Sequence, residues 1–275
     1  MQGGDQQAYD RGTSLFSPDG RIYQVEYARE AVNRGAASVG VRTAEGVVLA
    51  AQTRARSSLM EAQSIEKLHK IDDHVGTASA GHVADARRLI DFARRQAQVN
   101  RLRYGEPMGI ETLTKTVTDH IQQYTQVGGA RPFGVALIIG GVETLAKDIT
   151  DHIQQSTQVG GTRPYGAALL IAGVEDGRPR LFETDPSGTP HEWRAVAIGG
   201  SHDAIQSFLE EEYEEGMDLD TGVDLALRAL LVGTDDLEAG EISLATIDGD
   251  GYEEYTTDEI AAAFPETDAD DESDA

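Results

Sequence analysis

Few residue patterns in this chain could carry chemistry. The sequence has no cysteine, so it cannot form a disulfide, a thiolate nucleophile or a cysteine-ligated metal site. It also lacks the lysine of a phosphate-binding loop, the Gly-x-Ser-x-Gly elbow of a serine hydrolase and the His-Glu-x-x-His motif of a zinc protease. We therefore expect no cofactor and no bound metal.

Three remaining patterns have a structural interpretation that outweighs the functional one. Gly199-Gly200-Ser201 lies between an expected strand and an expected helix and could cradle a phosphate, but a tight turn is favoured. Asp248-Gly249-Asp250-Gly251 resembles the start of a calcium loop without its later ligands, and a hairpin turn is favoured. His120 and His152 each follow an aspartate within an expected helix, where a packed or solvated histidine is favoured over a metal ligand.

The balance of charge is strongly acidic. The 275 residues carry a net charge of −25, and 39% of them are hydrophobic, which is enough for one sizeable α/β core. Such a charge argues against nucleic-acid binding and favours adaptation to high salt over an ordinary acidic surface. No apolar run approaches the roughly 20 residues that span a bilayer, and the first residues do not resemble a secretory signal. We expect a cytoplasmic protein.

The predicted helices and strands alternate in groups along the chain. Hydrophobic periodicity predicts two helices between two groups of strands and two further helices after the second group. This order suits two antiparallel sheets enclosed by helical layers. The expected strands cover residues 36–42, 47–51, 68–71, 75–79, 134–142, 166–174, 180–184, 193–198, 242–247 and 252–255. The expected helices after the N-terminal one cover residues 83–100, 110–124, 203–214, 219–231 and 258–264.

The stretch from Tyr9 to Gly35 organises the chain. Ser17-Pro18-Asp19-Gly20 predicts a turn, because proline and glycine occupy its second and fourth positions. Val25 and Val32 recur at helical spacing after it, and Gly35 stands where a helix C-cap belongs. A helix that precedes every strand has no core of its own to cover. It must lie on the elements that follow or against a neighbouring subunit.

The same stretch resembles the N-terminal signature of proteasome α subunits of the archaeal type. The signature motifs present are Tyr9-Asp10-Arg11, Phe16-Ser17-Pro18-Asp19-Gly20-Arg21 and Gln24-Val25-Glu26-Tyr27-Ala28. The resemblance continues over nearly the whole chain, through residues 64–67, 81–87, 125–132 and 185–188. It implies the four-layer αββα sandwich of the N-terminal-nucleophile hydrolases, an α+β fold that the pattern alone does not distinguish from others.

A duplicated block interrupts the resemblance. Residues 111–142 recur as residues 143–174, at an offset of 32 and with nine differences. Each copy would supply one helix, one glycine loop and one strand, and the family implies a single copy. We expect only one copy to occupy the helix and central-strand position. The second copy is slightly favoured, because it runs directly into Asp176-Gly177 and the next strand, and the first copy would then be inserted between the two helices.

The resemblance also implies that the chain lacks a catalytic centre. In the catalytic β relatives, a threonine at the mature N-terminus is the nucleophile and a nearby lysine assists it. Matching the first strand places Ala36 at or next to the nucleophile position and Lys67 where the catalytic lysine would stand. We therefore expect no catalytic residue in this subunit, and catalysis in the β subunits.

A gate and a docking surface are implied instead. Members of the family form heptameric outer rings on rings of β subunits, admit unfolded protein substrates through an axial pore and bind AAA+ ATPase activators. The residues that match the gate cluster are Tyr9, Asp10, Pro18 and Tyr27. The residues that match the pocket for ATPase C-terminal tails are Arg29, Gly35, Lys67 and Gly81, with a surface ion pair to Glu66 or Asp72 as the alternative role of Lys67. The residues that match the pore constriction are Val127, Gly128 and Gly129, or their copies Val159, Gly160 and Gly161.

Three parts of the chain are therefore expected. Residues 1–21 form a gate arm and turn, residues 22–264 form one αββα domain that contains the duplication, and residues 265–275 form an acidic disordered tail. The main alternative is an α paralogue that the duplication prevents from assembling. A self-processing threonine peptidase is a weaker alternative, because Ala36 replaces the nucleophile.

Overall fold

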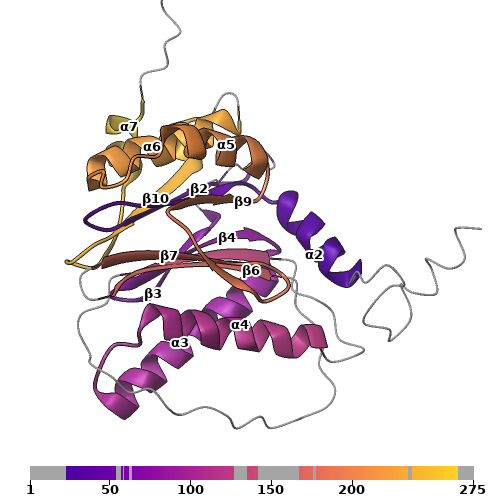
Figure 1. Cartoon of the computed structure of the whole chain (residues 1–275). Coiled ribbons are helices and arrows are strands. Elements are labelled where there is room, and N and C mark those ends of the chain that lie inside the picture. The colour runs from indigo at the N-terminus through magenta and orange to yellow at the C-terminus, as the bar shows by residue number, and fades with distance from the viewer. Residues whose placement is uncertain are drawn as a thin grey trace, which may run out of the picture.

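Two largely antiparallel sheets stack face to face, and helices cover their outer faces (Figure 1). The computed structural model describes residues 23–53, 57, 59–61, 64–126, 135–141, 167–175, 178–234 and 237–265. Helices α3 (Val83–Tyr104) and α4 (Ile110–Gln126) lie on one side of the sheet pair. Helices α5 (His202–Glu212) and α6 (Leu219–Val232) lie on the other side. The four-layer αββα sandwich expected from the sequence is confirmed.

Each sheet has a simple strand order. The sheet beneath α5 and α6 runs β11-β10-β2-β1-β9, and the sheet beneath α3 and α4 runs β3-β4-β5-β6-β7-β8. The strands of the first sheet are β1 (Ser38–Arg42), β2 (Val47–Gln52), β9 (Ala195–Ile198), β10 (Ile242–Ile247) and β11 (Tyr252–Glu254). The strands of the second sheet are β3 (Leu68–Asp72), β4 (Val75–Gly81), β5 (Val135–Gly141), β6 (Ala167–Glu175), β7 (Arg178–Thr184) and β8 (Pro190–Glu192).

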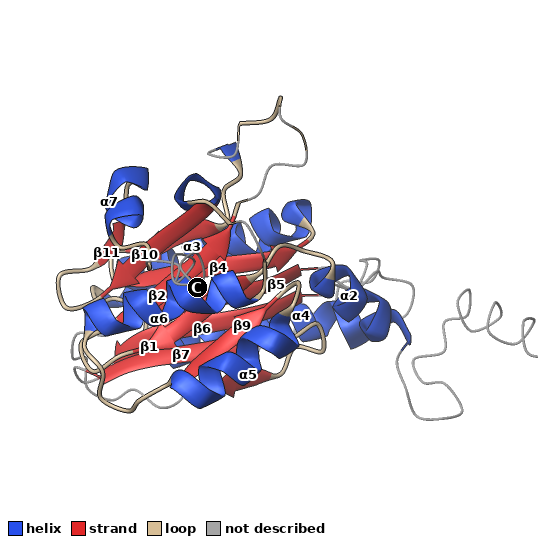
Figure 2. Cartoon of the chain, turned by 90° about the horizontal axis from the view of Figure 1, so that it is seen from above, coloured by secondary structure: helices blue, strands red, loops and turns tan. Residues whose placement is uncertain are grey.

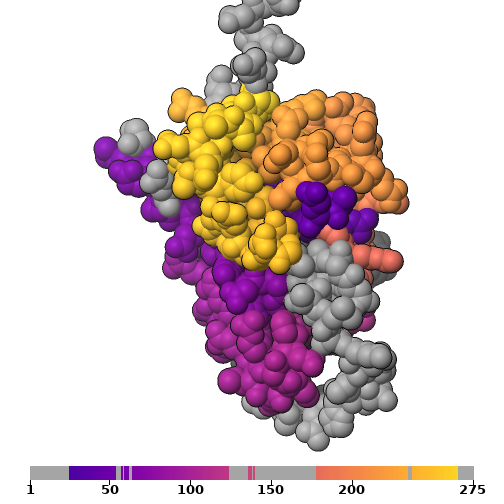
Figure 3. Space-filling model, turned by 90° about the vertical axis from the view of Figure 1, so that its left-hand side faces the viewer, coloured from indigo at the N-terminus to yellow at the C-terminus, as the bar shows by residue number. Residues whose placement is uncertain are grey.

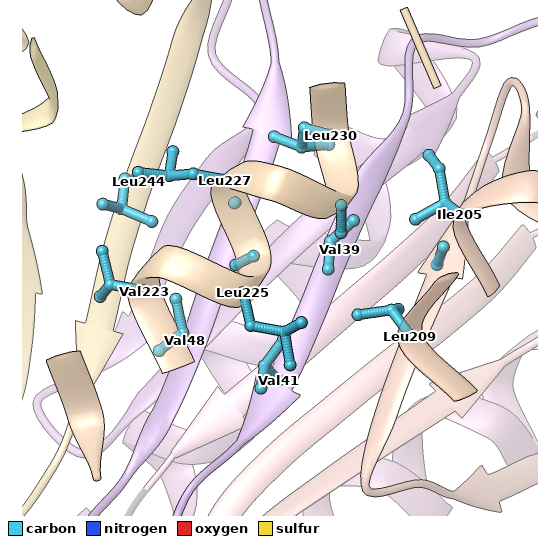
Figure 4. Packing of buried hydrophobic residues seen from close by; sticks show 14 of the residues in the cluster. Val39, Val41, Val48, Ile205, Leu209, Val223, Leu225, Leu227, Leu230 and Leu244 are labelled. Carbon is cyan, nitrogen blue, oxygen red and sulfur yellow. The ribbon is translucent and has the colours of Figure 1, made fainter. Parts of the chain in front are cut away.

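Apolar side chains fill the three spaces between the four layers. Leu225 and Leu230 of α6 pack over the first sheet (Figure 4). Leu49 of β2 lies in the cluster between the two sheets, and Leu89 of α3 lies in the cluster beneath the second sheet. β2 is buried at every position, which matches its uninterrupted run of apolar residues, because such a strand must be covered on both faces.

Helix α2 (Tyr23–Asn33) lies at one end of the sheet pair, apart from the four covering helices (Figures 1 and 2). Its apolar residues Val25, Ala28 and Val32 are buried, and Val32 belongs to the cluster between the sheets. The first helix therefore lies on the elements that follow it, which was one of the two expected placements. A helix held in this way fixes the point at which residues 1–22 join the fold.

The observed secondary structure differs from the prediction in short elements and in the ends of helices. Strand β8 was not predicted, because its three residues are all exposed and leave no hydrophobic periodicity to detect. Helix α3 continues past the expected residue 100 and ends at Gly105, whose φ of 75° is typical of a helix C-cap. The chain closes with a short 3-10 helix, η2 (Ala239–Glu241), and with α7 (Thr257–Ala262), which a capping box between Thr256 and Glu259 initiates.

The two favoured turn interpretations agree with the structure. Asp248 follows β10, and its side chain accepts hydrogen bonds from the backbone N–H groups of Asp250 and Gly251, which closes the hairpin to β11. Gly199 has a φ of 93° and begins the turn from β9 into α5.

Within the described residues, no group of three or more histidine or carboxylate side chains is placed to hold a metal ion. None of the described helices combines the length and apolarity needed to cross a bilayer.

The expected placement of the duplicated block is wrong. Helix α4 belongs to the first copy and follows α3 after the short connection 105–109, so the first copy is not inserted between these helices. Both copies supply a strand to the same sheet, as β5 and β6, although a single copy was expected at the central-strand position. The predicted hairpin after the second copy is confirmed, because Glu175 of β6 pairs with Arg178 of β7.

Candidate functional site

A buried lysine links the two sheets. Lys67 immediately precedes β3 and is 8% exposed. Its Nζ donates hydrogen bonds to the carbonyl oxygen of Ser79 in β4, at 3.2 Å, and to that of Ala36 before β1, at 3.4 Å. A buried ammonium group needs such acceptors, because removing it from water costs several kcal/mol. The alternative role of Lys67, a surface ion pair with Glu66 or Asp72, stays a prediction.

Glycines allow the backbone segments around Lys67 to approach closely. A Cβ atom on Gly35 would lie 2.6 Å from the backbone nitrogen of Gly81, closer than real Cβ atoms come to a neighbour. Gly81 itself has a φ of 108°, which favours glycine. We call Gly35, Ala36, Lys67, Ser79 and Gly81 the Lys67 junction. The structure thus brings together three of the four residues expected in the docking pocket.

The Lys67 junction holds backbone in place and offers no nucleophile. Ala36 presents only a methyl group at the position where the resemblance implies a threonine. The neighbouring hydroxyl of Ser38 donates a hydrogen bond to the carbonyl oxygen of Ser79 at 3.1 Å. The hydroxyl of Ser79 donates to the carbonyl oxygen of Lys67 at 3.4 Å. Activation of a hydroxyl requires an adjacent base that accepts its proton, and both serines face carbonyl oxygens instead.

A cleft of about 400 Å³ opens beside the Lys67 junction. Its walls come from the segment before β3, from β10 and from the start of α7, and these violet and yellow segments meet on the face shown in Figure 3. The lining is mixed, with Glu66, Lys67 and Glu254 beside the apolar Leu244 and Ile260. A cleft of this size and character suits a short peptide segment.

Arg29, the fourth expected docking residue, belongs to a different cavity. It lies on α2 and forms an ion pair with Asp185, which follows β7. Beside this pair is a cavity of about 190 Å³ that is also lined by Glu183 of β7 and His202 of α5. Arg29 thus fastens α2 to the second sheet, in addition to the apolar contacts of Val25 and Val32.

Glu183, which lines this cavity, was not among the site residues predicted from the sequence. Burial, reinforced by the neighbouring carboxylate of Asp185, raises the pKa of Glu183 from 4.5 to about 7, although His202 and Arg29 act in the opposite direction. The available signal was a glutamate that directly follows the buried pair Leu181-Phe182 in β7. That signal is weak, because alternate residues of a strand often face water.

Replacing Glu183 with glutamine is expected to flatten the dependence of stability on pH. Between pH 4.5 and about 7 the folded chain retains a proton on Glu183 that the unfolded chain has lost, so the parent loses stability as pH rises through this window. Glu183→Gln removes that loss, which amounts to at most about 3 kcal/mol above pH 7. Chemical denaturation at constant high KCl, at pH 5 and pH 8, measures both free energies of unfolding.

The matched control is Glu45→Gln, which changes an exposed carboxylate between β1 and β2. This control should unfold with the same pH dependence as the parent. Parallel stability curves for the parent and Glu183→Gln would contradict the assignment of a proton to Glu183 near neutral pH.

Of the remaining expected site residues, Tyr27 alone is among those that the structure describes. Tyr27 lies on α2 and is 49% exposed. The gate residues Tyr9, Asp10 and Pro18 lie outside the described residues. The same holds for both versions of the pore constriction, Val127, Gly128, Gly129, Val159, Gly160 and Gly161.

Comparison with known proteins identifies the family. The family model described as "Proteasome subunit" matches residues 32–145 and 142–247, and the two matches meet where the first copy of the duplicated block ends. A second model, which describes the N-terminal signature of A-type proteasome subunits, matches residues 9–31.

Proteins of halophilic archaea resemble the chain over nearly its full length. The proteasome alpha 2 subunit of Haloarcula marismortui is 60% identical, with 97% of each chain covered. The proteasome alpha subunit of Haloquadratum walsbyi is also 60% identical, with 98% of this chain and 96% of the relative covered. The proteasome alpha 2 subunit of Haloferax volcanii is 56% identical, with 100% and 97% covered. The chain therefore belongs to the proteasome subunit family and, within it, to the α subunits.

Proposed function

We propose that this chain forms the outer ring of a proteasome core particle in the cytoplasm, where it gates the entry of unfolded proteins and docks AAA+ ATPases. In this assignment the chain itself does not cut peptide bonds, and a partner β subunit supplies the threonine nucleophile. Other copies of the chain and the β subunits are its ring partners.

The observation that carries the non-catalytic role is the contact between Lys67 and Ala36. The lysine lies beside the start of β1, as the resemblance implies for the catalytic lysine of a β relative, but its Nζ is bound to the carbonyl oxygens of Ala36 and Ser79. A cation engaged in this way stabilises the junction between the sheets. It has no hydroxyl to activate at position 36.

The placement of α2 supports the gating role. This helix is held at one end of the sandwich by its buried apolar residues and by the ion pair of Arg29 with Asp185. The N-terminal signature is therefore joined to a fixed element, which is required if several copies are to direct residues 1–22 toward a common axis. Obstruction of a pore by such arms needs only excluded volume and no catalytic group.

Co-expression with a β subunit tests the assignment. In high KCl, the proposal predicts heptameric rings by electron microscopy and peptide hydrolysis that depends on the nucleophilic threonine of the β subunit. The chain alone should show no peptidase activity. A chain that stays monomeric with and without the β subunit would instead identify a paralogue disabled by its duplication, and peptidase activity of the chain alone would identify a threonine peptidase.

The docking role predicts a selective defect in Lys67→Met. This change removes the charge and keeps most of the side-chain volume, so we expect assembled particles to lose most ATPase-stimulated degradation of a folded protein while still hydrolysing short peptides. Lys70→Met is the matched control, because Lys70 lies on β3 with its side chain 46% exposed and paired to Asp73. Equal ATPase stimulation in the two variants would remove Lys67 from the docking site.

A further inference from the structure

One strand of the second sheet is paired in the same register by both copies of the duplicated block. Phe182 of β7 is the Cα partner of Ile139 in β5 and also of Ile171 in β6. The same double pairing holds for Leu181, with Gly140 and Ala172, and for Arg180, with Gly141 and Gly173. In each case the two partners are separated by the repeat offset of 32 residues.

The other edge of β7 is already occupied. Phe182 pairs there with Glu192 of β8, so β5 and β6 share the remaining edge. β5 and β6 also pair with each other in parallel, at two positions that are again 32 residues apart, Val135 with Ala167 and Ala136 with Ala168. One edge of a strand has one set of backbone donors and acceptors, which can satisfy one neighbour at a time. The two copies are therefore alternative neighbours of β7. On the other side of the exchanged position lies β4, which pairs with β5 along its whole length.

The helix of the first copy makes contacts that the second copy could reproduce. Glu111 of α4 pairs with Arg180 of β7 at 2.9 Å, and the amide of Gln122 donates a hydrogen bond to the carbonyl oxygen of Gly188 at 2.9 Å. His120 stacks on Phe92 of α3 with ring centroids 3.9 Å apart. The sequence of the second copy has Glu, Gln and His at the equivalent positions, which are Glu143, Gln154 and His152.

The buried face of the helix is retained as well. Leu113, Val117 and Ile121 of α4 are fully buried against α3 and the second sheet. Their equivalents in the second copy are Leu145, Ile149 and Ile153. The buried Thr114 beside them becomes Ala146, and the only change among the three apolar positions adds one methylene group. A substitution of that size in a core costs about 1–3 kcal/mol when space is lacking and less when neighbours can adjust.

The connections favour neither copy strongly. With the first copy in place, α3 leads to α4 through residues 105–109, and the long connection falls between β5 and β7. With the second copy in place, the tight hairpin from Glu175 to Arg178 is retained, and the long connection falls after α3. Because the cost of closing a loop rises only with the logarithm of its length, moving the same insertion from one place to the other changes little.

We propose that the duplication gives this chain two exchangeable native forms, in which either residues 111–142 or residues 143–174 supply the helix beneath the second sheet and the strand next to β7. The displaced copy forms an insertion at the surface of the sandwich. The exchange does not involve the strands of the first sheet, and the proposal does not depend on the gating role.

Competition for one cysteine tests the exchange in the full-length chain. The sequence has no native cysteine, so the triple variant Ile139→Cys, Ile171→Cys, Phe182→Cys contains only the introduced thiols. In a glutathione redox buffer at high KCl, the disulfide between positions 139 and 182 reports the first form, and that between 171 and 182 reports the second. Peptide mapping by mass spectrometry measures their ratio. We expect both disulfides, in a ratio between about 1:10 and 10:1, which corresponds to a difference within about 1.4 kcal/mol.

Two single-copy chains serve as controls and as a second test. One lacks residues 111–142 and carries cysteines at positions 171 and 182, and the other lacks residues 143–174 and carries them at 139 and 182. Both should fold and form their one disulfide to a similar extent. A ratio beyond 10:1 in either direction in the full-length chain, or folding of only one of the single-copy chains, overturns the proposal.

Discussion

Gly35→Ala is expected to lower the free energy of unfolding by about 3 kcal/mol, the upper end of the usual cost of inserting a carbon into a filled space. The added Cβ would lie 2.6 Å from the backbone nitrogen of Gly81 and 3.0 Å from the carbonyl oxygen of Val32. Both contacts are with backbone, so no flexible side chain can yield. The strain would open the contact between the end of α2 and β4, where the carbonyl oxygen of Gly35 also accepts a hydrogen bond from Gly200 at 2.7 Å.

Thermal unfolding at constant high KCl measures this effect. For a domain of this size, about 3 kcal/mol corresponds to a fall in Tm of about 6–12 °C. Gly240→Ala is the matched control, because a Cβ atom on Gly240 meets nothing within 4 Å and the residue has no positive φ. The control should stay within about 0.5 kcal/mol of the parent. A Gly35→Ala chain as stable as Gly240→Ala would show that the approach of Gly35 to Gly81 is not as close as described.

The sequence predicted the helices and strands whose local hydrophobic pattern is distinctive. The apolar run at residues 47–51 predicted the strand β2, and the helical spacing of Leu89, Ala93 and Ala97 predicted one buried face of α3. The αββα architecture itself came from the resemblance to the proteasome family. The resemblance also assigned Gly35, Lys67 and Gly81 to one site, and the fold brings these three residues together, while their docking role stays a prediction.

The sequence could not decide between the two copies of the duplicated block. Local propensity is nearly equal for residues 111–142 and 143–174, since they differ at only nine positions. The helix is held in place by tertiary contacts, such as the pairing of Glu111 with Arg180, which no local pattern contains. The cavity around Glu183 was missed for a related reason. Its members come from α2, β7 and α5, which are far apart in the sequence.

Lowering the KCl concentration from 1 M to 0.1 M is expected to lower the Tm of the chain by about 10 °C, equivalent to about 3 kcal/mol. The net charge of −25 repels itself in the compact state, and the Debye length grows from about 3 Å to about 10 Å over this range, so screening of that repulsion is lost. The relatives from halophilic archaea are consistent with a chain that folds in concentrated salt. A Tm that is equal at both concentrations would contradict this account.

Substitutions at the acidic C-terminal end of α5 test whether charge repulsion causes the loss of stability at low salt, because they change the net charge by different amounts. Glu210, Glu211 and Glu214 are exposed, whereas the neighbouring Glu212 and Glu215 pair with Arg228 and Arg194. Changing the three exposed residues to lysine should reduce the fall in Tm at 0.1 M KCl by about 3 °C. Changing them to glutamine alters the charge half as much and should give about half of that gain. Because lysine and glutamine differ in charge more than in helix propensity, equal gains from the two variants would assign the effect to local helix stability instead of long-range repulsion.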